Sequence, residues 1–166
     1  MNRLWVRNLI GVAVAAAALA TTCVVYLHPD WASYRSTVEP QRVASPGASA
    51  SVFGQTWRIG SVRRVATLPD RPYGPSIPQG ATLAVVIIER SGPPTTQPCD
   101  GVLTDGRRRW RDQSSSSVVY PLDPSATEFC NKPGPLQFDF LLPADVNPNA
   151  VDVIDSNNAI VLRLQF

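Results

Sequence analysis

Cys99 and Cys130 are the two residues whose chemistry most directly suggests a covalent link. The third cysteine, Cys23, lies inside a long apolar run, which leaves these two alone in the rest of the chain. In an oxidising compartment they are expected to form a disulfide that closes a loop of about 32 residues and stabilises the fold by about 3–4 kcal/mol. A redox-active thiol pair is the alternative, but their spacing is unlike Cys-x-x-Cys.

Arg107, Arg109 and Arg111 are the second candidate, because alternate residues of a strand lie on one face. Guanidinium groups at intervals of about 7 Å would suit lipid phosphates, an acidic glycan or an acidic protein partner. The alternative is that these charges cover an exposed edge strand and prevent its pairing with another sheet.

The dipeptide Asp105-Gly106, just before these arginines, predicts a two-residue hairpin turn. Such a turn would pair Thr104 with Arg107. Alternation along the strand then places the three arginines on the face opposite Trp110.

The remaining reactive side chains do not converge on a catalytic or metal-binding pattern. His28 is the only histidine and adjoins the apolar run, which excludes a histidine-based triad or zinc site farther along the chain. The acids lack the Asp-x-Asp-x-Asp-Gly calcium spacing, and the serine run 114–117, a predicted mobile loop, lacks the Gly-x-Ser-x-Gly context of a nucleophile. We therefore expect no enzymatic activity, no cofactor and no metal ion. The acids expected to lie in solvated loops are Asp100, Asp105, Asp152 and Asp155.

The composition limits the class of protein. The 166 residues include 15 Lys and Arg against 13 Asp and Glu, and the net charge of +2 is too small to argue for nucleic acid as a partner. With 44% hydrophobic and 17% charged residues, the chain has room for one packed domain and a further segment. A collagen, a coiled coil and a charge-rich disordered chain are excluded.

Residues 9–27 form an apolar run of 19 without a charged side chain. As a helix this run is about 28 Å long, close to the thickness of a bilayer's hydrocarbon core. Arg3 and Arg7 precede it and no Lys or Arg follows until Arg35, so residues 1–8 are expected in the cytoplasm. The sequence therefore predicts a single-pass signal anchor in the cell membrane, with the C-terminal domain outside.

Two alternatives stay open for the N-terminal segment. Ala18-Leu19-Ala20 satisfies the small-x-small rule for signal-peptide cleavage, which would release a secreted protein. Modification at Cys23 would instead give a lipoprotein, although Thr21-Thr22 fits poorly before such a cysteine.

Beyond the run, residues 28–52 are rich in Ser, Ala, Pro and Gly and have no apolar periodicity. They predict a flexible linker with a reach of about 25–30 Å. Residues 53–166 form the predicted extracytoplasmic domain, which is large enough for one hydrophobic core.

The apolar pattern of this domain has period two. Residues 136–142 and 160–166 alternate like half-buried strands, and 82–89 is continuously apolar and β-branched like a central strand. The apolar residues change phase at Gly60, which predicts a β-bulge. About seven short strands with Pro and Gly turns predict an all-β sandwich. The predicted core is Trp57, Leu83, Val85, Ile87, Phe138, Phe140, Ile160, Leu162 and Leu164.

The order of these motifs resembles a known family. An anchor and a low-complexity stalk are followed by ATLAVVIIER, LTDGRRRW, FDFLLPADV and AIVLRLQF. Over about residues 54–166 this resembles the immunoglobulin-like extracytoplasmic domains of unknown function on actinobacterial and other Gram-positive membrane proteins and lipoproteins. The resemblance implies an immunoglobulin-like fold and an envelope location, and it supplies no catalytic residues. A looser likeness in architecture is to small mycobacterial membrane proteins that assist lipid exporters.

These observations together predict a membrane-anchored, non-enzymatic protein of the bacterial cell envelope. We expect its domain to bind another protein or an envelope polymer. The alternative within this class is a small accessory subunit of an envelope lipid exporter or secretion system.

Overall fold

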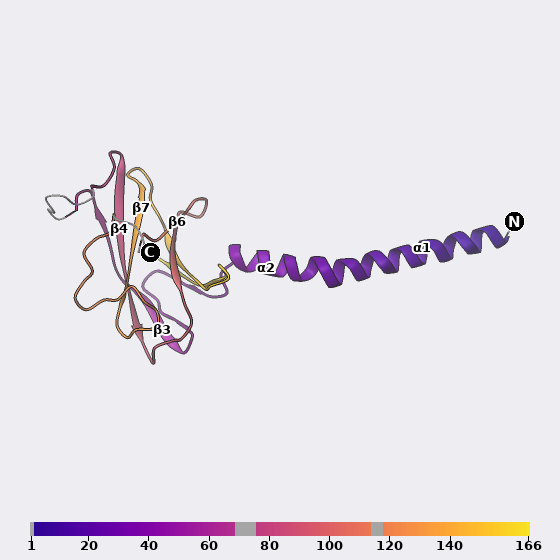
Figure 1. The fold of residues 1–166 in the computed structure, drawn as a ribbon, viewed down its shortest axis with the longest axis horizontal. Coiled ribbons are helices and arrows are strands. Elements are labelled where there is room, and N and C mark those ends of the chain that lie inside the picture. Colours follow the sequence, from indigo (N-terminus) through magenta and orange to yellow (C-terminus); the bar gives the residue numbers. More distant parts are fainter. Residues whose placement is uncertain (1, 69–75, 114–117) are drawn as a thin grey trace. The chain divides into compact units, whose positions relative to one another are not determined.

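The computed structural model describes residues 2–68, 76–113 and 118–166, so the serine run 114–117 lies outside the described residues. The chain divides into two compact units, Met1–Val38 and Glu39–Phe166. The first unit is helical and the second consists of strands (Figure 1).

The helical unit comprises α1 (Asn2–Thr22), the π-helical segment η1 (Cys23–Leu27) and α2 (His28–Val38). Pro29 has no N–H, and in a regular α-helix its ring would crowd a carbonyl one turn earlier, so a wider turn just before it relieves that conflict. The stretch Trp5–Val38 is long and apolar enough to cross a membrane, and its apolar side chains are exposed. A signal sequence has the same properties. The helix thus continues well beyond the predicted span of residues 9–27.

The second unit is a β-sandwich, which confirms the predicted fold class at that level. Within the described residues its nine strands form two sheets, with the orders β1-β9-β8-β5-β6 and β2-β3-β4-β7. The strands are β1 (Val43–Ala44), β2 (Ala50–Val52), β3 (Gln55–Val65), β4 (Ala81–Ser91), β5 (Asp100–Thr104), β6 (Arg109–Arg111), β7 (Leu136–Pro143), β8 (Ala150–Ile154) and β9 (Ile160–Gln165).

The segment 28–52 differs from the flexible linker that the sequence predicts. Its first part is α2, and its last part belongs to the sandwich. β1 pairs in parallel with β9, and the N–H of Gln41 donates to the carbonyl of Ile160 at 2.9 Å. Because β1 and β2 bury only Ala44 and Val52 respectively, they are too short to show an apolar period in the sequence.

β4 is the central strand of the four-stranded sheet and pairs with β3 and β7 over most of its length. The register of β3 against β4 shifts between Ile59 and Ser61, which confirms the predicted bulge at Gly60. β7 was expected to be half-buried, but Gln137 and Asp139 are buried as well as its apolar residues. Residues 120–127 bond to this outer face of β7, which is why its polar side chains are not in solvent.

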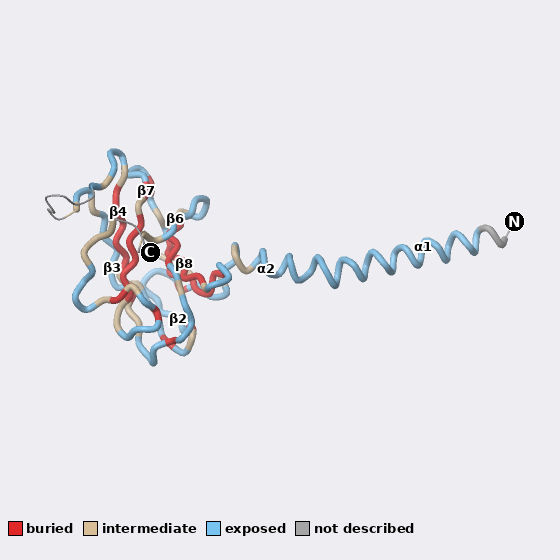
Figure 2. Tube along the Cα trace, in the orientation of Figure 1, coloured by how far each residue is buried: buried red, intermediate tan, exposed pale blue. Residues whose placement is uncertain are grey.

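The core lies between the two sheets and includes buried segments of β4 and β7 from one sheet and of β8 from the other (Figure 2). All the residues predicted for the core are buried except Ile87, which is half-buried. Leu83, Val85 and Ile160, however, lie outside the main buried cluster, to which β4 contributes Ala84, Val86 and Ile88. Trp57 is fully buried, and its indole N–H donates to the carbonyl of Val52 at 3.2 Å. The ring of Phe138 lies so close to Gly101 that a Cβ at that position would stand 2.7 Å from it.

Candidate anion-binding face

The turn between β5 and β6 is longer than the two-residue hairpin predicted from Asp105-Gly106. β5 pairs with β6 through Thr104 and Arg109, so four residues form the turn and the predicted pairing with Arg107 is wrong. A two-residue turn of the predicted kind needs a positive φ at both positions, and here only Gly106 has one, at 89°. The Asp105 carboxylate instead accepts the backbone N–H groups of Arg107 and Arg108, at 2.9 and 2.6 Å. The Arg108 and Arg107 N–H groups lower the pKa of Asp105.

The predicted arginine stripe is only partly a strand feature. Arg109 and Arg111 lie on β6, an edge strand, and Trp110 between them pairs with Leu103 and packs against the core. These two arginines therefore project from the outer face of the five-stranded sheet, as alternation predicts. Arg107 lies in the turn and does not continue the row.

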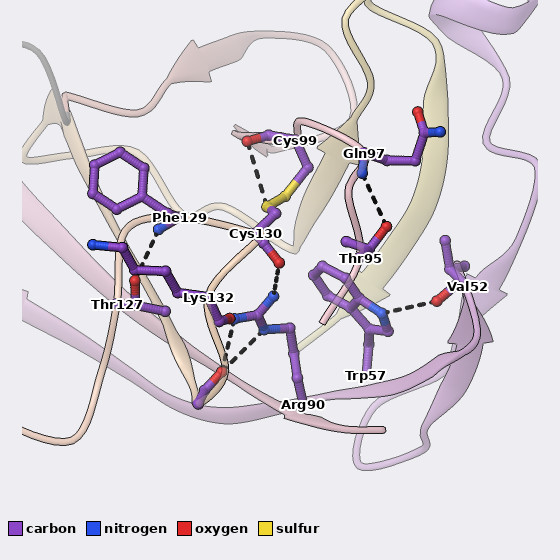
Figure 3. The surroundings of a disulfide bond; sticks show 11 residues. Val52, Trp57, Arg90, Thr95, Gln97, Cys99, Thr127, Phe129, Cys130 and Lys132 are labelled. Carbon is purple, nitrogen blue, oxygen red and sulfur yellow. Dashed lines mark hydrogen bonds between the residues drawn. A yellow bond between two sulfur atoms is a disulfide. The ribbon is translucent and has the colours of Figure 1, made fainter. Parts of the chain in front are cut away.

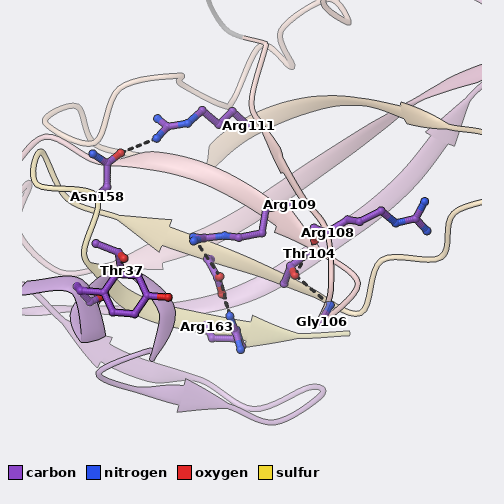
Figure 4. A network of polar contacts seen from close by, with 10 residues as sticks. Thr37, Thr104, Gly106, Arg108, Arg109, Arg111, Asn158 and Arg163 are labelled. Carbon is purple, nitrogen blue, oxygen red and sulfur yellow. Dashed lines mark hydrogen bonds and ion pairs between the residues drawn. The ribbon is translucent and has the colours of Figure 1, made fainter. Parts of the chain in front are cut away.

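The two β6 arginines make specific contacts on this face (Figure 4). An Nη of Arg111 donates to the side-chain oxygen of Asn158 at 2.6 Å. An Nη of Arg109 lies 3.6 Å from a carboxylate oxygen of Asp152, and its side chain is 39% exposed. Asn158 is a turn residue with a φ of 61°.

Asp152 was expected in a solvated loop, but it lies on β8 and its side chain is 0% exposed. Arg163, its neighbour on β9, donates from Nε and an Nη to the two carboxylate oxygens at 2.6 and 2.8 Å. The hydrogen bonds that Arg163 donates to Asp152 raise the pKa of Arg163. A two-pronged bond of this kind is strong and directional because both groups are planar.

We call Arg109, Arg111, Arg163 and Asp152 the arginine face. Two of its three cations, Arg109 and Arg163, contact the buried carboxylate, and Arg111 bonds to Asn158. The four residues together carry a net positive charge of two on one face of a sheet. Guanidinium groups held in this way present fixed N–H donors, which suits phosphate or carboxylate oxygens. Among the described residues, no group of three His, Cys, Asp or Glu side chains has the arrangement of a metal site.

The predicted disulfide between Cys99 and Cys130 is present (Figure 3). It ties the segment before β5 to the loop before β7. Arg90 fixes the same loop, since its guanidinium donates to the carbonyls of Cys130, Lys132 and Gly134 at 2.7–3.1 Å. Its guanidinium carbon also lies 5.4 Å from the ring centroid of Trp57, and burial lowers its pKa.

Sequence reasoning missed Asp152 and Arg163 as members of the arginine face. The signal that was available is the opposite charge of two residues inside neighbouring strands. It was not decisive because the register that pairs β8 with β9 depends on the turn between them.

Comparisons with known proteins find one solved structure that is similar to this chain. No family model and no curated protein matches the sequence. Among solved structures, the chain is similar to an uncharacterized β-sandwich protein from Clostridium difficile 630, with 10% sequence identity and a TM-score of 0.39. The likeness covers 77% of this chain and 96% of that chain. No conclusion about activity or partners follows from it.

Proposed function

We propose that this protein is a single-pass, membrane-anchored and non-enzymatic binding or accessory protein of the bacterial cell envelope. Its extracytoplasmic domain would bind an anionic polymer or an acidic protein partner. The observation that carries the proposal is the arginine face, in which Arg109 and Arg163 contact a buried carboxylate, on a domain that follows an apolar helix.

The N-terminal helix supports the anchor. Arg3 and Arg7 precede the apolar residues, and aromatic Trp31 and Tyr34 follow them, as in a helix whose N-terminus stays in the cytoplasm. Cell-membrane location with the domain outside is part of this proposal.

The strand order supports an immunoglobulin-like domain. The order β3-β4-β7 corresponds to strands A, B and E of that fold, and β6-β5-β8-β9 to strands C′, C, F and G. Seven strands then form the common fold, with β1 and β2 added before them. The disulfide and the buried Trp57 stand at different positions from those of antibody domains.

The arginine face is tested by binding of inorganic polyphosphate to the full chain in nanodiscs of zwitterionic lipid. We expect the double variant Arg109→Gln/Arg111→Gln to bind at least about tenfold more weakly than the wild type, and added salt to weaken the wild type. Arg163 is left unchanged because it holds Asp152.

The matched control is Arg58→Gln/Arg63→Gln, which removes the same charge from β3, a strand of the other sheet. We expect this control to change polyphosphate binding less than about twofold, since it lies outside the arginine face. Binding that is equally affected by both double variants, or by neither, would refute the arginine face as the contact surface. Arg107→Gln alone is expected to behave like the control.

Two further measurements address the anchor and the partner. The intact mass of the membrane-extracted protein should include residues 1–27; loss of the first 20 or 22 residues would instead mean a secreted protein or a lipoprotein.

Co-purification from mild detergent tests the alternative function, because a transporter in the eluate would support an exporter accessory subunit.

A further inference from the structure

A pocket of about 450 Å³ lies beside the disulfide. The segment before β5 forms one wall and the loop before β7 forms the other. Its lining residues are Thr96, Pro98, Cys99, Asp100, Glu128, Phe129, Cys130 and Asn131. The pocket therefore combines an apolar surface of proline, disulfide and aromatic ring with two carboxylic acids.

The loop that carries Glu128 and Phe129 is held in place from two sides. The disulfide links Cys130 to the opposite wall, and Arg90 donates to three carbonyls of the loop (Figure 3). The N–H of Phe129 itself donates to the hydroxyl of Thr127 at 3.1 Å. A site fixed in this way loses little conformational entropy when a ligand binds.

Phe129 has no role in the core, because 54% of its surface is exposed. The Nζ of Lys132 lies 4.7 Å from the centroid of its ring. A cation at that distance is attracted by the negative face of the aromatic system. The ammonium group of Lys132 thus already makes a cation–π contact with the Phe129 ring.

The two acids of the pocket are available to a ligand. Within the part of the chain that the structure describes, neither Asp100 nor Glu128 has a hydrogen-bond or ion-pair partner for its side chain. Asp100 begins β5 on an exposed strand end, and Glu128 adjoins Phe129. Two unpaired carboxylates beside an exposed ring attract a positive group with an apolar stem.

We propose that this pocket binds a lysine or arginine side chain on an extended segment of a partner protein. The methylene stem would pack on Pro98 and the ring of Phe129, while the charged end would reach Asp100 and Glu128. This site is distinct from the arginine face, since none of its lining residues belongs to that face and it selects the opposite charge.

The test uses the full chain in nanodiscs of zwitterionic lipid and three acetylated, amidated pentapeptides that differ in a central arginine, lysine or citrulline. Citrulline keeps the shape of arginine without its charge. We expect the arginine and lysine peptides to bind and citrulline to bind at least about tenfold more weakly. Asp100→Asn/Glu128→Gln should weaken the arginine peptide about tenfold or more, and Phe129→Ala should weaken it severalfold.

Two variants separate this site from nonspecific attraction. Asp145→Asn removes an exposed acid that does not line the pocket, and it should change binding less than about twofold. Lys132→Met removes the competing ammonium group while keeping its backbone carbonyl for Arg90, so it should strengthen binding at least about twofold.

Several outcomes would overturn the proposal. Equal binding of the citrulline and arginine peptides would show that charge is not recognised. An unchanged affinity in the Asp100→Asn/Glu128→Gln variant would place the peptide elsewhere. Self-association of the full chain that this variant abolishes would show that the occupant is a second copy and not a partner segment.

Discussion

Asp152 and Asp139 are buried on the outer faces of the two sheets, and their surroundings differ in one respect. Asp152 accepts hydrogen bonds from Nε and an Nη of Arg163 at 2.6 and 2.8 Å. Asp139 has no cation bonded to it among the described residues; it accepts the backbone N–H of Tyr120 and a weak contact of 3.3 Å from Gln137. Burial raises the pKa of Asp139 to about 6, and the Tyr120 N–H opposes that shift only in part.

The difference shows how a sheet can bury an acid in two ways. On the five-stranded sheet, a cation from the neighbouring strand neutralises the carboxylate, and the adjacent Arg109 and Arg111 leave a net positive surface. On the four-stranded sheet, Gln137 and Asp139 bond to the backbone of residues 120–123, and the acid has neutral hydrogen-bond partners. Nearby Glu128 and Asp112 raise the pKa of Asp139 further. The first arrangement can serve recognition, and the second fastens a segment to a sheet.

The largest effect is expected from Arg163→Met, which leaves Asp152 buried without its two-pronged partner. Removal of one member of a buried pair typically costs about 3–5 kcal/mol in the free energy of unfolding, because a buried carboxylate is left uncompensated. Urea unfolding of the full chain, followed by tryptophan fluorescence, measures this loss. The double variant Asp152→Asn/Arg163→Met should lose less than the single one. A loss below about 1 kcal/mol in the single variant would show that the pair contributes little.

A smaller loss is expected from Gln137→Met on the other sheet. The Gln137 carbonyl oxygen accepts the N–H of Asp123 at 3.0 Å, and methionine fills the space without replacing that acceptor. A lost hydrogen bond at a buried site typically costs about 1–2 kcal/mol. Gln113→Met is the matched control. Among the described residues the Gln113 side chain makes one exposed contact, at 3.4 Å, so this variant should lose less than about 0.5 kcal/mol. Equal losses in both variants would argue against a fastening role for Gln137.

The pH dependence of stability should separate the two acids. The folded-state pKa of Asp139 lies at about 6, above its ordinary value of 3.8, so the native state binds this proton more tightly than the unfolded state does. Its contribution to stability is complete below about pH 4 and is lost as the pH rises to about 6. In Asp139→Asn this component should be absent, and at neutral pH the variant should be at least as stable as the wild type. Thermal unfolding of both proteins across this pH range makes the comparison; parallel profiles would contradict the raised pKa.

The two acids also mark the limit of what the sequence predicts. Period-two alternation found β7 and β9, the continuous apolar run found β4, and most of the core follows from these three strands. Alternation also assigned Gln137 and Asp139 to solvent, because it cannot report that residues 120–127 return to cover them. The same limitation hid the pairing of Asp152 with Arg163, which depends on strand register.

Only part of the arginine face was predicted, because alternation reports which side chains share a face but not how a turn is built. Side-chain alternation correctly placed Arg109 and Arg111 on one face, since it needs only that the segment is a strand. The turn was predicted wrongly because Asp105 bonds to the N–H groups of its own turn, which favours a longer loop than Asp-Gly alone suggests. A local side-chain hydrogen bond of this kind cannot be recognised from the periodicity of apolar residues.

The smallest effect on stability is expected from Arg109→Gln, and it sharpens the comparison between the two partners of Asp152. The Arg109 guanidinium lies 3.6 Å from the carboxylate and is more exposed than that of Arg163, at 39% against 24% of the side chain. Ion pairs with this exposure typically contribute less than about 1 kcal/mol, so unfolding should change little. Polyphosphate binding should nevertheless weaken severalfold, because the substitution removes a partly exposed cation from the arginine face. Arg163→Lys should show the opposite pattern. It keeps the positive charge but loses the bidentate hydrogen bond to Asp152, so the free energy of unfolding should fall clearly while polyphosphate affinity changes little. If Arg109→Gln destabilises the domain as much as Arg163→Lys does, Arg109 is a structural partner of Asp152 and the arginine face loses its central contact.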